Sequence, residues 1–95
     1  MRYSPEALEQ IDGLYADRAL EQLADRVDDL LDELEANPGA AHLRRHQLRQ
    51  PRASQGTPFW FFNVAGSGQH WRIIWNLDAD NEPHIYYVGP EWKDA

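Results

Sequence analysis

The run Trp71-Arg72-Ile73-Ile74-Trp75-Asn76-Leu77 is dense in aromatic and β-branched side chains, and it predicts a β-strand. Phe59-Trp60-Phe61-Phe62-Asn63-Val64 has the same character and is too short and too aromatic for a helix. Gly66-Ser67-Gly68 separates the two runs, and a glycine-containing turn in this position is typical of a β-hairpin. A polar turn at residues 78–83 then precedes a third predicted strand, His84-Ile85-Tyr86-Tyr87-Val88.

Two registers are open for this hairpin, and they place different side chains together. If Val64 pairs with Trp71, Asn63 faces Arg72. A shift of one residue puts Phe62 opposite Arg72 instead, because successive side chains of a strand alternate between its faces.

The residues before the hairpin predict two helices. Ser4 and Pro5 are typical of a helix start, and Gly13 is expected to interrupt or end this first helix. Asp17 can cap a second helix that runs to about Ala36, before an Asn-Pro-Gly string. Its apolar positions recur every three or four residues, at Leu20, Leu23, Val27, Leu30 and Leu34.

Helices followed by a run of strands favour an α+β fold over alternating βαβ units. We therefore predict a single domain over residues 1–95, with two N-terminal helices packed on an antiparallel sheet of three to four strands.

The composition excludes several classes of protein. The chain has no cysteine, which rules out disulfides, thiolate nucleophiles and cysteine-based zinc sites. It also has no signal-peptide pattern at its N-terminus and no apolar run long enough to span a bilayer. We expect a cytoplasmic protein that does not enter the membrane.

The formal net charge of −7 is unevenly distributed. Residues 1–35 hold eleven acids against three arginines, whereas residues 36–77 hold five arginines and no acid. Residues 78–95 are acidic again, with five acids and one lysine. The basic middle is either a solvated surface between acidic ends or a binding surface for phosphate or an acidic partner.

Three short strings stand at the end of the second predicted helix and in the second and third predicted strands. They are Leu34-Glu35-Ala36-Asn37-Pro38, Trp71-Arg72-Ile73-Ile74-Trp75 and Tyr87-Val88-Gly89. With the order of elements, they resemble the RelE/ParE superfamily of type II toxin–antitoxin toxins. The resemblance implies a partner antitoxin. It also implies one of two activities: ribosome-dependent mRNA cleavage by a metal-independent endoribonuclease, or inhibition of DNA gyrase.

The chain departs from this family at both ends. The family opens with a strand, for which only residues 1–3 are available here. Ribonuclease members often carry an arginine after the Val-Gly string and a tyrosine near the C-terminus, where this chain has Pro90, Glu91 and no tyrosine. The alternative is therefore a non-catalytic module on the same scaffold that binds protein or RNA.

Arg72 is the strongest candidate for a functional residue, because it interrupts an apolar strand and burying an unpaired guanidinium is costly. The resemblance implies that it binds the RNA backbone near the cut phosphate, where a guanidinium stabilises developing charge. Alternatively, Arg72 lies on the solvent face and pairs with Asn76 or with an acid.

Cleavage of RNA without a metal needs groups that transfer protons and cations that bind the phosphate. His46 and His70 are the candidates for proton transfer, because histidine titrates near neutral pH. The candidates for RNA binding are the middle arginines, Arg44, Arg45, Arg49 and Arg52. The other interpretation is a solvated basic arm.

A metal site is not expected. His42 and His46 have the spacing of two ligands on one helix face, but no acid lies near them in the sequence. We predict neither a metal nor a cofactor.

Overall fold

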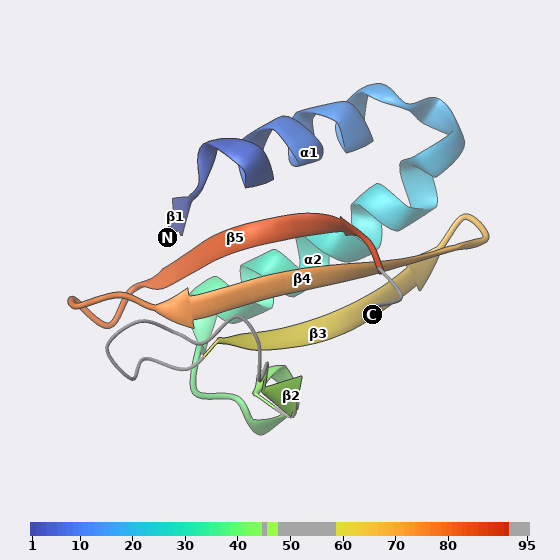
Figure 1. Cartoon of the computed structure of the whole chain (residues 1–95). Coiled ribbons are helices and arrows are strands. Elements are labelled where there is room, and N and C mark those ends of the chain that lie inside the picture. Colours follow the sequence, from blue (N-terminus) through green and yellow to red (C-terminus); the bar gives the residue numbers. More distant parts are fainter. Residues whose placement is uncertain (45, 48–58, 92–95) are drawn as a thin grey trace.

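The computed structural model describes residues 1–44, 46–47 and 59–91. The elements are, in order, β1 (Arg2–Tyr3), α1 (Pro5–Ala16), the 3₁₀ turn η1 (Arg18–Leu20), α2 (Glu21–Ala36), the 3₁₀ turn η2 (Ala41–Leu43), β2 (His46–Gln47), β3 (Trp60–Gly66), β4 (Gln69–Leu77) and β5 (Pro83–Pro90). In this part of the chain the fold is α+β, and two helices accompany an open sheet of order β1-β5-β4-β3-β2 (Figure 1). The sheet is mixed, because β1 runs parallel to β5 and the other pairs are antiparallel.

The first helix begins where the sequence predicts. Ser4 Oγ accepts a hydrogen bond from the backbone N–H of Ala7 at 3.0 Å, and Pro5 is the first helical residue. The predicted interruption at Gly13 is wrong, because α1 continues through it to Ala16. Gly13 is exposed, so a glycine there lowers helix propensity by only about 1 kcal/mol and does not break a helix whose other face is buried.

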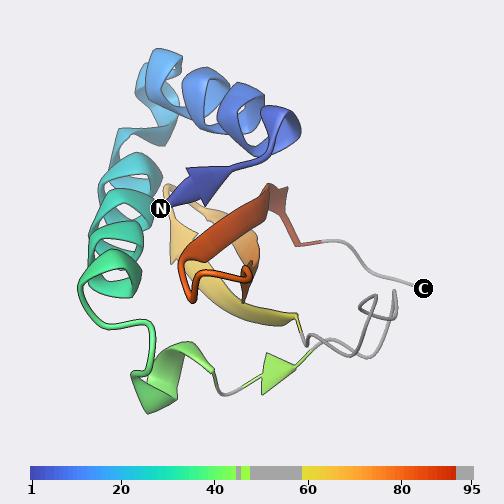
Figure 2. The ribbon, with the colours of Figure 1, turned by 90° about the vertical axis from the view of Figure 1, so that its left-hand side faces the viewer.

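The helix α2 is amphipathic. Its buried side chains share one face and are Leu23, Ala24, Val27, Leu31 and Leu34. The Asp17 side chain caps η1, just before α2, by accepting from the N–H of Ala19 at 3.0 Å. Figure 2 shows both helices on the same side of the sheet, where α1 packs against β5 and α2 against β3.

The central hairpin has the first of the two registers that the sequence allows. Val64 pairs with Trp71, and Asn63 with Arg72. The turn between the strands places Ser67 at φ 52° and Gly68 at φ 75°, the left-handed conformations that suit the twist of a two-residue hairpin. Ser67 Oγ also accepts from the N–H of Leu23 at 3.2 Å, so the turn is tied to the start of α2.

The two faces of the sheet differ in what they contact. The face toward the helices contributes Phe62, Val64, Trp71, Ile73, Trp75, Ile85 and Val88 to the hydrophobic core. Strand alternation turns the intervening side chains the other way, to what we call the distal face. Its main side chains are Phe59, Phe61, Asn63, Arg72, Ile74, Asn76, His84 and Tyr86.

The prediction of three to four antiparallel strands is wrong in two details, because β1 and β2 are additional and β1 is parallel. Each has only two residues, so neither carries a periodic pattern that a sequence could reveal. Contacts distant in sequence hold β1 in place: the N–H of Ser4 donates to Ile85 O at 2.9 Å, and Ser4 Oγ donates to Tyr86 O at 3.1 Å. Neither α1 nor α2 has the length and apolar content that crossing a membrane requires.

Candidate functional site

Arg72 lies near the middle of the distal face, and its guanidinium is held from several sides. Nε donates to Asn63 Oδ1 at 3.2 Å, and Nη2 lies 3.0 Å from Glu91 Oε2 in an ion pair. Its side chain is 15% exposed and that of Glu91 is 37% exposed. The pairing with an acid is one of the arrangements that the sequence left open. A partly exposed guanidinium fixed in this way is oriented in advance for an anion.

Phe61 brings two of the predicted site residues together. The Arg72 Cζ atom lies 4.2 Å from the centroid of the Phe61 ring, a cation–π distance. The ring of His46, on β2, stacks on the same phenylalanine, with centroids 5.1 Å apart and an angle of 18° between the planes. The distal face therefore places an arginine and an imidazole around one aromatic ring.

His70 lies on β4, two residues before Arg72 and exposed. Two residues along a strand are roughly 7 Å apart and share a face. The carbonyl of His70 accepts from the N–H of Glu91 at 3.0 Å, which anchors the acid beside the strand that carries Arg72. The three predicted catalytic residues, Arg72, His46 and His70, therefore lie on one side of the sheet.

Tyr87 lies on β5, where it pairs with Ile74 of β4. Its hydroxyl donates to the carbonyl of Pro90 at 2.8 Å. Burial raises the pKa of Tyr87 and the charge of Glu6 raises it further, while the positive charge of Arg72 acts in the opposite direction. Gly89 makes room for this arrangement, because a Cβ there would lie 2.7 Å from the Tyr87 hydroxyl. Tyr87 is consequently a neutral hydrogen-bonding group near Arg72 at neutral pH.

The Arg44 guanidinium contacts the protein's own backbone and an aromatic ring of β3. Its Nε donates to the carbonyl of Pro38 at 2.7 Å, and its guanidinium lies 4.7 Å from a ring centroid of Trp60. These contacts hold the segment after α2 against β3. The remaining predicted RNA-binding residues lie outside the described residues: Arg45, Arg49 and Arg52.

A second group of side chains lies elsewhere on the distal face. The rings of His84 and Tyr86 stack with centroids 4.2 Å apart, and Phe59 meets Tyr86 edge-on at 4.9 Å. Asn76 pairs with His84 in the β4–β5 ladder and is only 7% exposed. Among the residues that the structure describes, its Oδ1 has no hydrogen-bond partner. A buried amide oxygen without a partner is rare enough to need an explanation.

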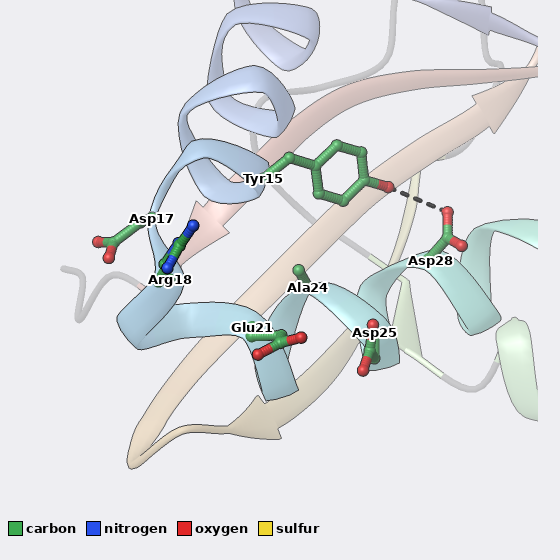
Figure 3. A pocket seen from close by; sticks show the side chains of 7 residues that line it. All are labelled: Tyr15, Asp17, Arg18, Glu21, Ala24, Asp25 and Asp28. Carbon is green, nitrogen blue, oxygen red and sulfur yellow. Dashed lines mark hydrogen bonds between the residues drawn. The ribbon is translucent and has the colours of Figure 1, made fainter.

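A cavity of about 670 Å³ opens on the other side of the molecule, where η1 joins α1 to α2 (Figure 3). The hydroxyl of Tyr15 crosses it to Asp28 Oδ1 at 3.0 Å. Its other lining residues are Asp17, Arg18, Glu21, Ala24 and Asp25. Four carboxylates against one guanidinium would repel a polyanion, so this cavity is unsuited to binding phosphate.

His42 has a protein partner, Glu33, whose Oε1 lies 2.6 Å from its Nε2. In the described ranges, no group of three or more histidine, aspartate and glutamate side chains could hold a metal ion.

The distal face combines a guanidinium oriented for an anion, three imidazoles and several aromatic rings, a set suited to a phosphodiester with bases attached. The sequence predicts Arg72, His46 and His70 as candidates; the structure adds the contacts of Arg72 with Phe61 and Glu91 and the burial of Asn76. Strand alternation would have placed Phe61 and Asn76 on this face once the register was known. The contact of Glu91 with Arg72 could not be predicted, because it depends on the direction in which the chain leaves β5.

Comparison with protein-family models, with curated proteins and with solved structures finds no match to this chain.

Proposed function

We propose that this protein is a RelE/ParE-like toxin of a type II toxin–antitoxin system and that its distal face cleaves messenger RNA on the ribosome. The observation that carries the proposal is the placement of Arg72 and His46 around the Phe61 ring. The string that contains Arg72 is also the most distinctive part of the family resemblance. A small protein antitoxin is the implied partner.

The reaction needs a charge-stabilising group at the phosphate. In cleavage without a metal, the 2′-hydroxyl loses its proton and attacks the adjacent phosphorus. The bond to the 5′-oxygen breaks, and a 2′,3′-cyclic phosphate and a 5′-hydroxyl result. Negative charge builds on the non-bridging oxygens, and a guanidinium that is already oriented stabilises it without reorganising. Arg72, held by Asn63 and by the ring of Phe61, meets this requirement.

In this proposal, imidazoles remove the proton of the 2′-hydroxyl and protonate the 5′-oxygen. His46 and His70 are both exposed, so each can exchange protons with water and with substrate. His46 stacks on the ring that contacts Arg72, and it is therefore the first choice for the group that removes the 2′-hydroxyl proton. His70 would protonate the leaving 5′-oxygen.

The proposal is tested by inducing the protein in a bacterial host and counting surviving colonies. Arg72→Ala, expressed to the same level, should restore growth. Arg18→Ala, which removes an exposed arginine of η1 at the acidic cavity, should remain as toxic as wild type. Mapping of mRNA 5′ ends then identifies the target. New ends within translated regions support cleavage, whereas toxicity without new ends, accompanied by DNA breaks, would favour gyrase inhibition.

One observation favours a second function, a non-catalytic binding module. Glu91 forms an ion pair with Arg72, where family ribonucleases often place a second arginine in the sequence. Binding without cleavage, and without any effect on growth, would support this reading.

A further inference from the structure

We propose that Asn76, together with Phe59, His84 and Tyr86, forms a recognition site for one unpaired nucleobase, with adenine as the favoured base. This inference rests on the proposed function, because it assigns base recognition to the face that would bind RNA. It concerns different residues from those around Arg72, and the two can be tested apart.

The first support is the buried side-chain oxygen of Asn76. Asn76 is 7% exposed, and its Oδ1 has no donor within the described ranges of the chain. Leaving a buried polar atom without a partner destabilises a protein, and an apolar side chain of similar size would avoid that cost. An asparagine at this position is therefore better explained by a ligand than by folding.

The second support is the set of rings around it. His84 is the cross-strand neighbour of Asn76, and it stacks on Tyr86 at 4.2 Å with an angle of 14° between the planes. Phe59 completes the group at 4.9 Å from Tyr86. The three rings are half-buried, so their remaining exposed surface can stack on a base.

The chemistry of the amide indicates the base. An asparagine side chain presents one acceptor beside one donor, which matches the N6 amino group and N7 of adenine in a bidentate pair. Oδ1 would accept from the amino group, and Nδ2 would donate to the ring nitrogen. Because Oδ1 is covered, a base reaches it only when a covering side chain rotates aside.

The site lies along the strand from the proposed phosphate site. Asn76 and Arg72 are four residues apart on β4 and share the distal face, which corresponds to roughly 13 Å along the strand. Neighbouring nucleotides of an extended single strand can span this distance. The phosphate at Arg72 and the base at Asn76 would then belong to different nucleotides of one RNA.

The test measures the binding of fluorescein-labelled hexamers of adenylate and of uridylate by fluorescence anisotropy, at low salt. Wild type should bind oligoadenylate at least about fivefold more tightly, the lower end expected for one bidentate pair. Asn76→Leu should abolish this preference and melt no lower than wild type. Tyr86→Leu should weaken both hexamers, whereas Tyr15→Leu, the matched loss of a tyrosine at the acidic cavity, should weaken neither.

The outcomes separate the two proposals. Arg72→Ala should weaken both hexamers equally and keep the preference for adenylate. If Arg72→Ala weakens binding while Asn76→Leu keeps the preference, the base site is wrong and the phosphate site stands. If Asn76→Leu removes the preference and Arg72→Ala changes nothing, the base site stands and the role given to Arg72 is wrong. A wild-type protein that binds neither hexamer, or binds both equally, overturns the base site.

Discussion

The carboxylate of Glu91, just beyond β5, meets the guanidinium of Arg72 on β4, with Oε2 and Nη2 3.0 Å apart. The backbone holds the acid in place, because the N–H of Glu91 donates to the carbonyl of His70. An RNA phosphate at Arg72 would have to displace this carboxylate or bind beside it. If the proposed function holds, the strength of the ion pair sets part of the affinity for RNA.

Glu91→Gln should strengthen RNA binding. It removes a carboxylate that competes for the guanidinium, and partly exposed ion pairs are worth up to about 1 kcal/mol, so we expect roughly two- to fivefold tighter binding. The dissociation constant of a labelled RNA hexamer measures the effect. Glu9→Gln on α1 changes the net charge equally, and an identical gain in that variant would assign the effect to charge alone.

Arg44→Ala should destabilise the fold and leave RNA binding unaffected. It removes the hydrogen bond to Pro38 and the contact with Trp60, at a cost of about 1–3 kcal/mol in the free energy of unfolding. Denaturation in urea, followed by tryptophan fluorescence, measures this cost. If the variant keeps wild-type stability but binds RNA more weakly, Arg44 contributes to RNA binding and this prediction is wrong.

Gly66→Ala and Gly13→Ala should change stability in opposite directions. A Cβ on Gly66 would lie 2.9 Å from the backbone Cα of Leu23, which cannot move without shifting α2, so we expect a loss of about 1–3 kcal/mol. No atom of the described residues lies within 4 Å of a Cβ on Gly13, where alanine should stabilise the helix by about 0.5–1 kcal/mol. Melting temperatures of the two variants test this, and equal shifts would contradict it.

The contribution of Asp78 should depend on pH. Its carboxylate accepts from the N–H groups of Glu82 and Asp80, and chiefly the bond from Glu82 lowers its pKa from the ordinary value of 3.8. A lowered pKa means that the folded state favours the ionised form. The resulting stability is complete above the ordinary pKa and disappears as the pH falls through the lowered value.

Asp78→Asn should therefore reduce stability at pH 7 and converge with wild type in acid. Urea denaturation at a series of pH values between 2 and 7 measures the difference. Asp80→Asn removes the same charge from the same turn, but the Asp80 side chain is 77% exposed and should contribute little. A difference that is independent of pH would show that the charge of Asp78 is not responsible.

The sequence was a good guide wherever a periodic pattern was long enough to read. The aromatic runs around Gly66 and Gly68 predicted the hairpin, and alternation limited its register to two choices, of which the observed pairing of Asn63 with Arg72 is one. The two-residue strands β1 and β2 carry no periodic pattern, because tertiary contacts define them, and only the family resemblance pointed to a first strand at residues 1–3. The predicted interruption of the first helix at Gly13 is wrong for a related reason. Burial of the opposite helix face outweighs the low helix propensity of one glycine.

The candidate site was predictable to the same extent. Arg72 was predictable as a candidate, because a charged side chain inside an apolar strand stands out in the sequence. The contacts that decide what Arg72 can do, with Glu91 and with the Phe61 ring, join residues that are 19 and 11 positions apart and depend on strand pairing. Composition alone did not predict the surroundings of Arg44, whose guanidinium packs on Trp60.

The most direct test of the central claim is cleavage of a defined messenger RNA by the purified protein, with translating ribosomes present. We expect wild type to release fragments that end in a 2′,3′-cyclic phosphate, Arg18→Ala to match it, and Arg72→Ala to lose nearly all activity while it stays folded. If wild type leaves the RNA intact, or if Arg72→Ala cleaves as well as wild type does, the account of Arg72 as the catalytic arginine of a ribosome-dependent ribonuclease is wrong.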